Sequence, residues 1–329
     1  MLNNSTVLIT GGTGSFGHEF VQAAFDSYKP KKVIVFSRDE FKQYNMAKLF
    51  PDGKYPIRYF LGDIRDRSRL GRAFYGVDIV IHAAALKQVP ALEYNPIEAV
   101  KTNIIGADNI VDAAIDSGVK KVIALSTDKA VNPINLYGAT KLAAEKIFIA
   151  ANAYGGDRTA FSVVRYGNVV ASRGSVIPLF MDLKQKGVKE FPITDLNMTR
   201  FWMTLKQSVG LVIKALEVAV GGEVFVPRIP SMKITDLARA IDPDCEFKVT
   251  GIRPGEKVHE TLISEDESRN TKVLDDIYVI ISQFARQGTK AFERYKKNKP
   301  VEPGFAYRSD KNDKNLTRNE LQKILKDMV

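Results

Sequence analysis

Residues 5–17 read STVLITGGTGSFG, and this stretch decides the fold of the chain. Its first six residues are a short apolar run, and a helical pattern, HEFVQAAFDSY, follows the glycines. A strand, a glycine turn and a helix in this order are typical of a dinucleotide site, where the glycines allow a tight turn and close approach of a pyrophosphate. The first helical amides would then face the phosphates. The expected contacts are Gly11, Thr13, Gly14, Ser15, Phe16 and Gly17.

Strand-like and helical segments go on alternating after this unit. Further strands are expected at KKVIVF (31–36), within VDIVIHAAALKQVP (77–90) and at KKVIALST (120–127). Strands that alternate with helices predict an α/β fold with a doubly wound parallel sheet, also called a Rossmann sheet, that binds ligands at the carboxyl ends of its strands.

The sequence shows no internal repeat and no low-complexity linker, so we expect two interwoven lobes rather than two domains in series. The dinucleotide-binding domain should span residues 1–166, with return segments at about 200–228. Residues 167–329 should form mainly a smaller substrate-binding lobe, which ends in a basic tail at about 285–329.

The segment after the second strand, SRDEFKQ, bears on the choice of cofactor. A site that prefers NAD usually has an acidic residue at this strand end, where it bonds the ribose hydroxyls. Here Ser37 and Arg38 come first and Lys42 follows one turn on, and a guanidinium with small hydroxyls suits a 2′-phosphate. We therefore predict NADP. Asp39 leaves NAD as the alternative, because a strand end misplaced by two residues would put its carboxylate at the ribose.

Later strand ends complete the expected cofactor site. The run PIRYFLGDIRD places Asp63 and Ile64 to bracket an adenine, and three alanines after His82 would let the cofactor lie against the backbone. His82 itself is expected to be a packed core histidine. Lys87 is expected near the phosphates of substrate or cofactor, although an exposed position is equally compatible with the sequence. The further cofactor contacts predicted are Asp63, Ile64, Ala83, Ala84, Ala85, Lys87 and Asn103.

The composition is that of an ordinary globular protein, with 45% hydrophobic and 26% charged residues among 329. No apolar run reaches the roughly 18–20 residues of a membrane span, and no signal sequence opens the chain, so we expect a cytoplasmic protein without a membrane partner. A single cysteine, Cys245, and three scattered histidines predict no metal site. The net charge of +10 suits small phosphorylated ligands, and no stripe of bases and aromatics predicts nucleic-acid binding.

The stretch STDKAVNPINLYGATK, residues 126–141, carries the expected chemistry. Tyr137 and Lys141 lie one helical turn apart, and an ammonium lowers the pKa of a neighbouring phenol, which is ordinarily about 10. Such a phenol can remove a hydroxyl proton while hydride leaves the same carbon. Thr127, at the end of the preceding strand, can bond the same oxygen. Simple alcohol oxidation leaves Asp128 and Lys129 without a task.

With these residues in place, the chain resembles the extended short-chain dehydrogenase/reductases that act on nucleotide sugars. Within that group it most resembles the inverting UDP-N-acetylglucosamine 4,6-dehydratases that begin pseudaminic acid synthesis. The resemblance runs from about residue 5 to about residue 280, and the last 45 or so residues carry no motif. It rests on TGGTGSFG, SRDEFKQ, HAAALKQVP, STDKAVNPINLYGATK, RYGNVVASRGSVIP, MTRFWM and IRPGEKVHETL.

The resemblance implies a task for Asp128 and Lys129. Oxidation of the sugar at C4 makes the C5 proton acidic, water then leaves across C5 and C6, and hydride returns to C6 so that NADP ends as it began. The resemblance implies Lys129 as the C5 base and Asp128 as the acid at the C6 oxygen, and these two roles could be exchanged. Tyr137 is available on the other face of the sugar, which fits protonation of C5 from the side opposite Lys129 and hence inversion. Burial or Lys141 would lower the pKa of Lys129, whereas Asp128 would raise it, and the sequence leaves the balance open.

The resemblance also implies a substrate wall. Asn168 would lie against the diphosphate, residues 172–178 along the uridine, and Arg253 would bind the diphosphate through its two-pronged guanidinium, held by Glu256. Phe201 and Trp202 are expected in the core rather than stacked on a base. The predicted substrate contacts are Lys87, Asn168, Arg173, Val176, Pro178, Thr194, Arg200, Arg253 and Glu256.

Three other functions stay open at this point. A nucleotide-sugar 4-epimerase would use Thr127, Tyr137 and Lys141 but would leave Asp128 and Lys129 without a role. A retaining dehydratase would give the other configuration at C5. An NADP-sensing binding protein would bind the cofactor but show no turnover. Relatives form dimers through long helices corresponding to 98–116 and 138–153, so the resemblance implies a homo-oligomer with a UDP-sugar substrate.

Overall fold

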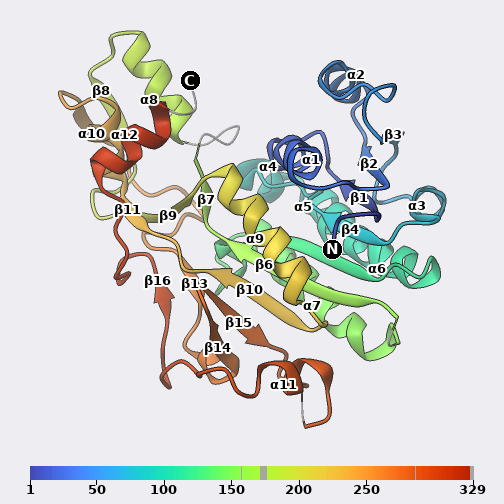
Figure 1. The fold of residues 1–329 in the computed structure, drawn as a ribbon. Helices are drawn as coiled ribbons and strands as arrows, with labels where there is room; N and C mark the ends of the chain where they lie inside the picture. The colour runs from blue at the N-terminus through green and yellow to red at the C-terminus, as the bar shows by residue number, and fades with distance from the viewer. Residues whose placement is uncertain (157, 171–175, 286, 327–329) are drawn as a thin grey trace.

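The computed structural model describes residues 1–156, 158–170, 176–285 and 287–326. Nine strands within these ranges form one sheet, seven of them parallel, with an antiparallel hairpin at one edge, so the predicted parallel, doubly wound sheet is confirmed (Figure 1). In sheet order the strands are β14 (Thr271–Leu274), β15 (Ile277–Ile281), β10 (Glu223–Pro227), β6 (Ala160–Tyr166), β5 (Lys121–Thr127), β4 (Ile79–His82), β1 (Thr6–Thr10), β2 (Lys32–Ser37) and β3 (Ile57–Leu61).

The centre of this sheet is buried on both faces, as is usual for parallel strands. All five residues of β1 are buried, and the strand pairs with β2 on one side and β4 on the other. Thr10 therefore lies between Phe36 and His82 at the carboxyl ends of three neighbouring strands. His82 is buried in the core, as predicted.

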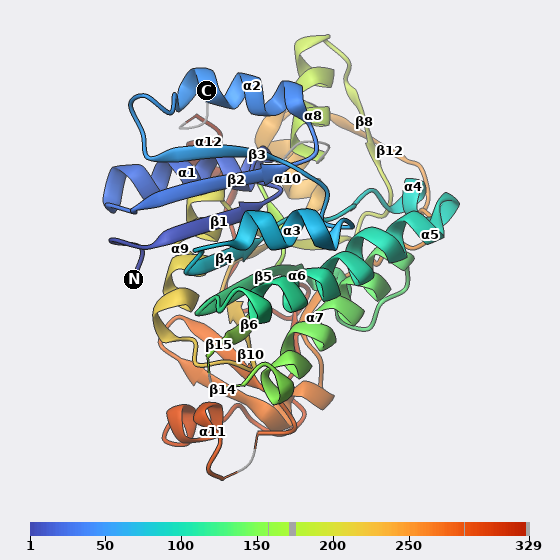
Figure 2. The same ribbon diagram turned by 90° about the vertical axis from the view of Figure 1, so that its right-hand side faces the viewer.

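Helices cover both faces of the sheet (Figures 1 and 2). Two of them, α1 and α9, pack against each other on one face, whereas α3, α6 and α7 form a row on the other, and α2 contacts β2 and β3. Their bounds are α1 (Ser15–Ser27), α2 (Glu40–Leu49), α3 (Arg67–Phe74), α6 (Gly106–Asp116), α7 (Leu136–Tyr154) and α9 (Leu205–Val218).

The segment 98–116, expected as a long helix, is helical throughout but contains a π-helical turn. α4 (Val89–Tyr94) and α5 (Pro96–Ala99) precede a π-helical turn, Val100–Ile105, which leads directly into α6. Such turns are rare and often occur at functional sites. This one buries Thr102 and Asn103 beside the start of α7.

The remaining elements form a smaller part with its own core. Its strands pair as β7–β9–β11, β8–β12 and β13–β16, and Phe180 stacks on Phe191 with ring centroids 4.9 Å apart. Phe201 and Trp202 are both buried, as predicted, Phe201 in the larger core and Trp202 in the smaller one. The elements are β7 (Asn168–Val169), α8 (Val176–Gln185), β8 (Glu190–Ile193), β9 (Thr199–Met203), β11 (Ser231–Lys233), α10 (Ile234–Ile241), β12 (Glu246–Val249), β13 (Thr261–Ile263), β16 (Tyr307–Arg308) and α12 (Arg318–Lys326).

The C-terminal segment packs onto both parts. It contains α11 (Lys290–Tyr295), β16 and α12, and it buries Tyr295, Tyr307 and Leu321. The β14–β15 hairpin also joins the main sheet, beyond the return segments expected at about 200–228. Within the described ranges, no helix has the length and apolar character needed to cross a bilayer.

Candidate active site

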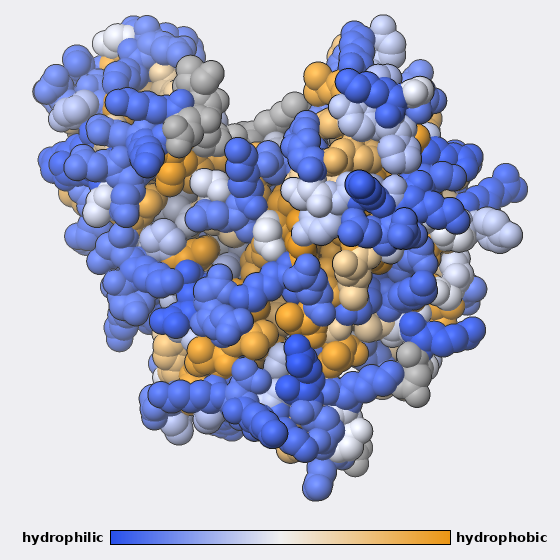
Figure 3. All heavy atoms as spheres, viewed as in Figure 1, coloured by the Kyte–Doolittle hydropathy of each residue, from blue (hydrophilic) through white to orange (hydrophobic). Residues whose placement is uncertain are grey.

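A cavity of about 1090 Å³ opens at the carboxyl ends of the parallel strands, between the main sheet and the smaller part. Figure 3 shows the hollow between the two sides of the molecule, with apolar residues along its floor. Most predicted site residues line it: Gly11, Thr13, Gly14, Ser15, Phe16, Ser37, Arg38, Lys42, Ile64, Ala83, Ala84, Ala85, Lys87, Thr127, Lys129, Tyr137, Lys141, Asn168, Val176, Pro178, Thr194, Arg200, Arg253 and Glu256.

The glycine turn has the shape that a dinucleotide requires. Gly11 has a φ of +65°, and a Cβ there would come within 2.9 Å of the Ala84 backbone. Gly14 precedes the first residue of α1, so the amides at the start of this helix face the cavity. Gly17 does not line the cavity. A Cβ at this position would stand 2.1 Å from the Gly12 carbonyl oxygen, so Gly17 serves the close packing of α1 on the turn.

At the end of β2, Ser37 is buried, whereas the charged side chains that follow it lie at the cavity. Ser37 is buried and accepts a hydrogen bond from Gln43 Nε2 at 3.0 Å, whereas Arg38 is exposed at the cavity rim, 3.5 Å from Asp63. Asp39 caps α2: its carboxylate accepts from the Lys42 backbone amide at 2.9 Å and pairs with Lys42 Nζ at 3.1 Å. These bonds to Lys42 lower the pKa of Asp39.

Two predicted cofactor contacts lie behind the cavity wall. Asp63 does not line the cavity; its carboxylate binds Arg65 at 2.7 Å and lies 3.5 Å from Arg38, which does line it. Asn103 is buried and forms reciprocal hydrogen bonds of 2.9 Å with the backbone of Leu86, and it donates to Thr140 at 3.0 Å. Asn103 therefore holds the loop after β4 against α7.

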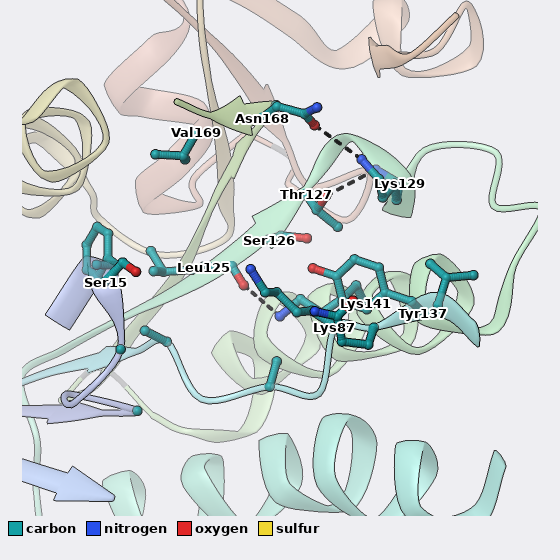
Figure 4. A pocket seen from close by; sticks show the side chains of 18 of the residues that line it. Ser15, Lys87, Leu125, Ser126, Thr127, Lys129, Tyr137, Lys141, Asn168 and Val169 are labelled. Atoms are coloured by element: carbon teal, nitrogen blue, oxygen red, sulfur yellow. Dashed lines mark hydrogen bonds between the residues drawn. The ribbon is translucent and has the colours of Figure 1, made fainter. Parts of the chain in front are cut away.

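α7 presents Tyr137 and Lys141 to the cavity (Figure 4). Asn135 caps this helix by accepting from the Gly138 amide at 2.8 Å. Lys141 Nζ donates to the Leu125 carbonyl at 2.6 Å, and burial lowers the pKa of Lys141 to about 8 against the pull of Glu145.

The expected lowering of the Tyr137 pKa by Lys141 is not found. Burial raises the pKa of Tyr137, and the cation that opposes this rise is Lys129, with help from a hydrogen bond to Thr127. The phenol therefore interacts with both ends of the 127–129 segment, through a hydrogen bond with Thr127 and through the charge of Lys129.

Asp128 is fully buried and does not line the cavity. It belongs to a 3-10 turn, Asp128–Ala130, that follows β5, and its Oδ1 accepts from the Thr127 hydroxyl at 2.9 Å and from Lys129 Nζ at 3.0 Å. Its Oδ2 has no hydrogen-bond partner within the described parts of the chain. Burial raises the pKa of Asp128 against the opposing charge of Lys129.

Lys129 reaches the cavity with its ammonium between acidic and polar groups. Its Nζ lies 3.0 Å from Asp128 and 3.3 Å from Glu260. It also donates to Asn168 Oδ1 at 3.5 Å, a contact drawn in Figure 4. Although burial acts in the opposite direction, the carboxylates of Asp128 and Glu260 hold the pKa of Lys129 above its usual range. The balance that the sequence left open thus favours the charged ammonium.

Glu260 is the acidic residue that reasoning from sequence missed. It lines the cavity and is buried, with 3% of its side chain exposed. It lies within the stretch IRPGEKVHETL, from which only Arg253 and Glu256 were predicted as contacts. Nothing in a single sequence shows which of the two glutamates points toward Lys129.

The substrate wall differs from expectation in one pairing. Glu256 lies 3.6 Å from Arg200 rather than holding Arg253, which is exposed at the cavity. Arg200 is buried and donates to the backbone carbonyls of Thr199 and Lys257, so it braces the wall from within. Arg173 lies outside the described residues.

Two comparisons of sequence place the chain among known proteins. Residues 7–282 match a family described as polysaccharide biosynthesis protein. A UDP-N-acetylglucosamine 4,6-dehydratase (inverting) of Campylobacter jejuni is 51% identical over 99% of this chain and 98% of its own length. A UDP-glucose 4-epimerase of Rickettsia massiliae is 45% identical over 85% of this chain and 84% of its own.

Solved structures agree on the fold. Pen from Bacillus thuringiensis has a TM-score of 0.89 and 39% identity, and the match covers 100% of this chain and 99% of that one. The dTDP-glucose 4,6-dehydratase DesIV of Streptomyces venezuelae, solved with NAD, has a TM-score of 0.70 at 22% identity, over 89% of this chain and 97% of that one. At that identity DesIV supports the fold alone.

Proposed function

The chain belongs to the polysaccharide biosynthesis protein family, and from that premise we propose that it is an inverting UDP-N-acetylglucosamine 4,6-dehydratase. The observation that carries this function is the Asp128–Lys129 pair, joined by a 3.0 Å ion pair and set directly beside Thr127 and Tyr137. The proposed product is UDP-2-acetamido-2,6-dideoxy-β-L-arabino-hex-4-ulose. It forms by oxidation at C4, loss of water across C5 and C6, and addition of hydride at C6 and of a proton at C5.

A nicotinamide dinucleotide fits the first part of the cavity. The left-handed Gly11, the α1 amides and the small Ala83–Ala85 side chains form a cradle that any Cβ at Gly11 would obstruct. A nicotinamide cofactor held by these residues would supply hydride transfer between C4 and C6 of the sugar.

We propose NADP as that cofactor. Arg38 and Lys42 line the cavity at the end of β2, where a 2′-phosphate would lie. The Asp39 carboxylate, on which the NAD alternative depends, is engaged by the amide and ammonium of Lys42. Asp39 also lines the cavity, but these bonds hold its carboxylate at the start of α2.

In the oxidation step, Tyr137 takes the proton of the C4 hydroxyl. Thr127 lies at the end of β5 within hydrogen-bonding reach of the phenol, and the Lys129 ammonium favours phenolate. Lys141, with a pKa of about 8, stays mostly protonated at neutral pH and holds α7 to β5 through the Leu125 carbonyl.

In the elimination step, the pair behind Tyr137 handles two protons. We assign Lys129 as the C5 base, because its amine lines the cavity, and we keep Asp128 as the acid for the C6 oxygen on the family resemblance. Burial raises the pKa of Asp128, but its carboxyl group does not itself line the cavity. Lys129 must lose its own proton before it can take one from C5, so the pH at which it does so governs the elimination.

A 4-epimerase is the second candidate, favoured by the name of the Rickettsia relative. An epimerase needs Thr127, Tyr137 and Lys141 but gives no work to a buried acid and a cavity-lining lysine. A retaining dehydratase would use the same pair and differ only in the face on which C5 is protonated.

Incubation of the purified protein with UDP-N-acetylglucosamine in heavy water, without added reductant, separates these functions by proton NMR. A 6-methyl signal, deuterium at C5 and the L-arabino configuration are expected. UDP-N-acetylgalactosamine would identify an epimerase, a D-xylo 4-keto product a retaining enzyme, and an unchanged substrate would contradict dehydration of this sugar.

Assembly, pathway and location remain predictions. Ile105 and Tyr154 are exposed on the helices for which a homo-oligomeric contact is expected. The product configuration would suit pseudaminic acid synthesis, and the cytoplasmic location rests on the sequence alone.

A further inference from the structure

Glu260 brings a negative charge to the catalytic pair from a distant part of the chain. Its Oε1 lies 3.3 Å from Lys129 Nζ and 3.9 Å from Arg200 Nε, and its side chain is almost fully buried. Burial raises the pKa of a carboxyl group, but Lys129, Arg200 and Lys257 together hold the pKa of Glu260 below its usual range. Glu260 is therefore a buried carboxylate rather than a neutral acid.

The backbone of Glu260 is fixed before any substrate arrives. Its amide donates to Ser309 Oγ at 2.9 Å, and its carbonyl accepts from the Ser309 amide at 2.9 Å. The Ser309 hydroxyl also contacts Thr199 Oγ1 at 2.7 Å on β9. The C-terminal segment thus anchors the residue that faces Lys129.

One oxygen of Glu260 is left over. Its Oε2 has no hydrogen-bond partner in the described parts of the chain, although an orphaned buried carboxylate oxygen costs free energy. Asp128 Oδ2, on the other side of Lys129, is orphaned in the same way. Retaining both carboxylates beside one lysine is unfavourable for stability, which points to a purpose in the reaction.

We propose that Glu260 is a positioning residue for the dehydration: it holds the Lys129 ammonium at the cavity and sets the pH at which that amine becomes a base. The kinetic consequences of this inference rest on the proposed function, whereas the Lys129–Glu260 contact does not. The epimerase alternative gives Lys129 no proton to remove from C5 and so makes no use of such a contact.

Charged groups on several different segments of the chain surround Lys129. Asp128 raises its pKa from within the same turn, and Arg200 on β9 lowers it. Glu260 adds a second negative charge at close range, and an opposite charge at this distance typically shifts a pKa by about 1–3 units. The titratable or charged groups facing Lys129 are Asp128, Tyr137, Lys87, Arg200, Lys257 and Glu260.

Glu260→Gln tests the proposal, because glutamine keeps the size of the side chain and removes its charge. The ascending limb in the pH dependence of kcat for dehydration should move to lower pH by about one unit or more, because the ammonium loses a carboxylate partner. Glu260→Asp keeps the charge but withdraws it by one methylene, so the limb should move in the same direction by less. Glu265→Gln, an exposed glutamate on the same segment, is the control and should leave the limb in place.

A second measurement does not depend on turnover. In protein with 13C-labelled lysine, the Cε resonance that disappears in Lys129→Met is titrated in the wild type and in Glu260→Gln. A lower pKa of Lys129 in Glu260→Gln supports the proposal even if the wild type fails to dehydrate the sugar, which would contradict only the proposed function. An unmoved Lys129 titration, or a kcat reduced equally at all pH values, would overturn the proposal and leave Glu260 a merely structural residue.

Discussion

At the scale of single residues, Lys129 and the neighbouring carboxyl groups of Asp128 and Glu260 distinguish the elimination from the oxidation. Thr127, Tyr137 and Lys141 take part in oxidation at C4, where the Lys129 ammonium favours the phenolate, and Lys129 is also placed to act on the ketone that results. The ammonium lies 3.0 Å from a fully buried acid and also borders the cavity, so proton exchange within the pair needs no solvent.

At this scale we predict that Lys129→Ala separates oxidation from elimination. C4 oxidation should still occur, because Thr127, Tyr137 and Lys141 remain, but more slowly than in the wild type, because the cation that favours the Tyr137 phenolate is lost. It should appear as slowly developing absorbance of reduced nicotinamide. Release of dehydrated product should fall about 100-fold or more, the usual loss when an acid–base group is removed. Dehydration at the wild-type rate would show that Lys129 is not the C5 base.

Arg38 carries the prediction about cofactor choice. Arg38→Ala should weaken NADP binding by about 10- to 100-fold and leave NAD binding nearly unchanged, because only a 2′-phosphate uses the guanidinium. Calorimetric titration with both cofactors measures this. Arg72→Ala removes an exposed arginine from α3 and is the charge-matched control. Equal weakening of NAD and NADP would contradict a 2′-phosphate contact.

At the scale of elements, strands and helix ends hold the site in place. β4, at the centre of the sheet, places His82 against Thr10 with an Nδ1–Oγ1 distance of 2.8 Å, and burial lowers the pKa of His82 to about 3. α7 starts at a cap, Asn135, whose amide also donates to the Gly255 carbonyl at 2.7 Å. The catalytic helix is thereby tied to the substrate wall.

His82 predicts a loss of stability in acid. Between pH values of about 3 and 6.5, the unfolded state binds a proton that folded His82 refuses, so the free energy of unfolding rises with pH across this window. Acidification from about pH 7 to about pH 5 should therefore destabilise the wild type by about 2 kcal/mol more than His82→Asn. Urea unfolding at both pH values tests this, and equal losses would contradict a neutral, buried His82.

The cap of α7 predicts a coupling of stability to turnover. Asn135→Ala should lower the free energy of unfolding by about 1 kcal/mol and also reduce kcat, because the cap positions Tyr137 two residues on. Thr204→Ala removes the capping box of α9 at a similar cost in stability. That control should leave kcat unchanged. Equal kcat values for Asn135→Ala and Thr204→Ala would show that the α7 cap does not contribute to catalysis.

At the scale of the whole molecule, the cavity is shared by segments that are distant in sequence. The glycine turn and the Tyr137–Lys141 spacing were predictable, because each signal lies within one local element. Glu260 was not, because its contact with Lys129 depends on how Ser309 and β9 hold a remote loop. The expected Arg253–Glu256 pairing failed for the same reason: two neighbours in one motif were paired, whereas in the fold Glu256 pairs with Arg200 on β9.

The central claim is that one site oxidises, dehydrates and reduces the same sugar, and an isotope label tests it most directly. UDP-N-acetylglucosamine carrying deuterium at C4 is incubated with the protein and its bound cofactor, and the product is examined by NMR and mass spectrometry. The account predicts that the label moves to the C6 methyl group while no reduced cofactor accumulates. Deuterium that returns to C4, in a product that keeps its C6 hydroxyl, would contradict it.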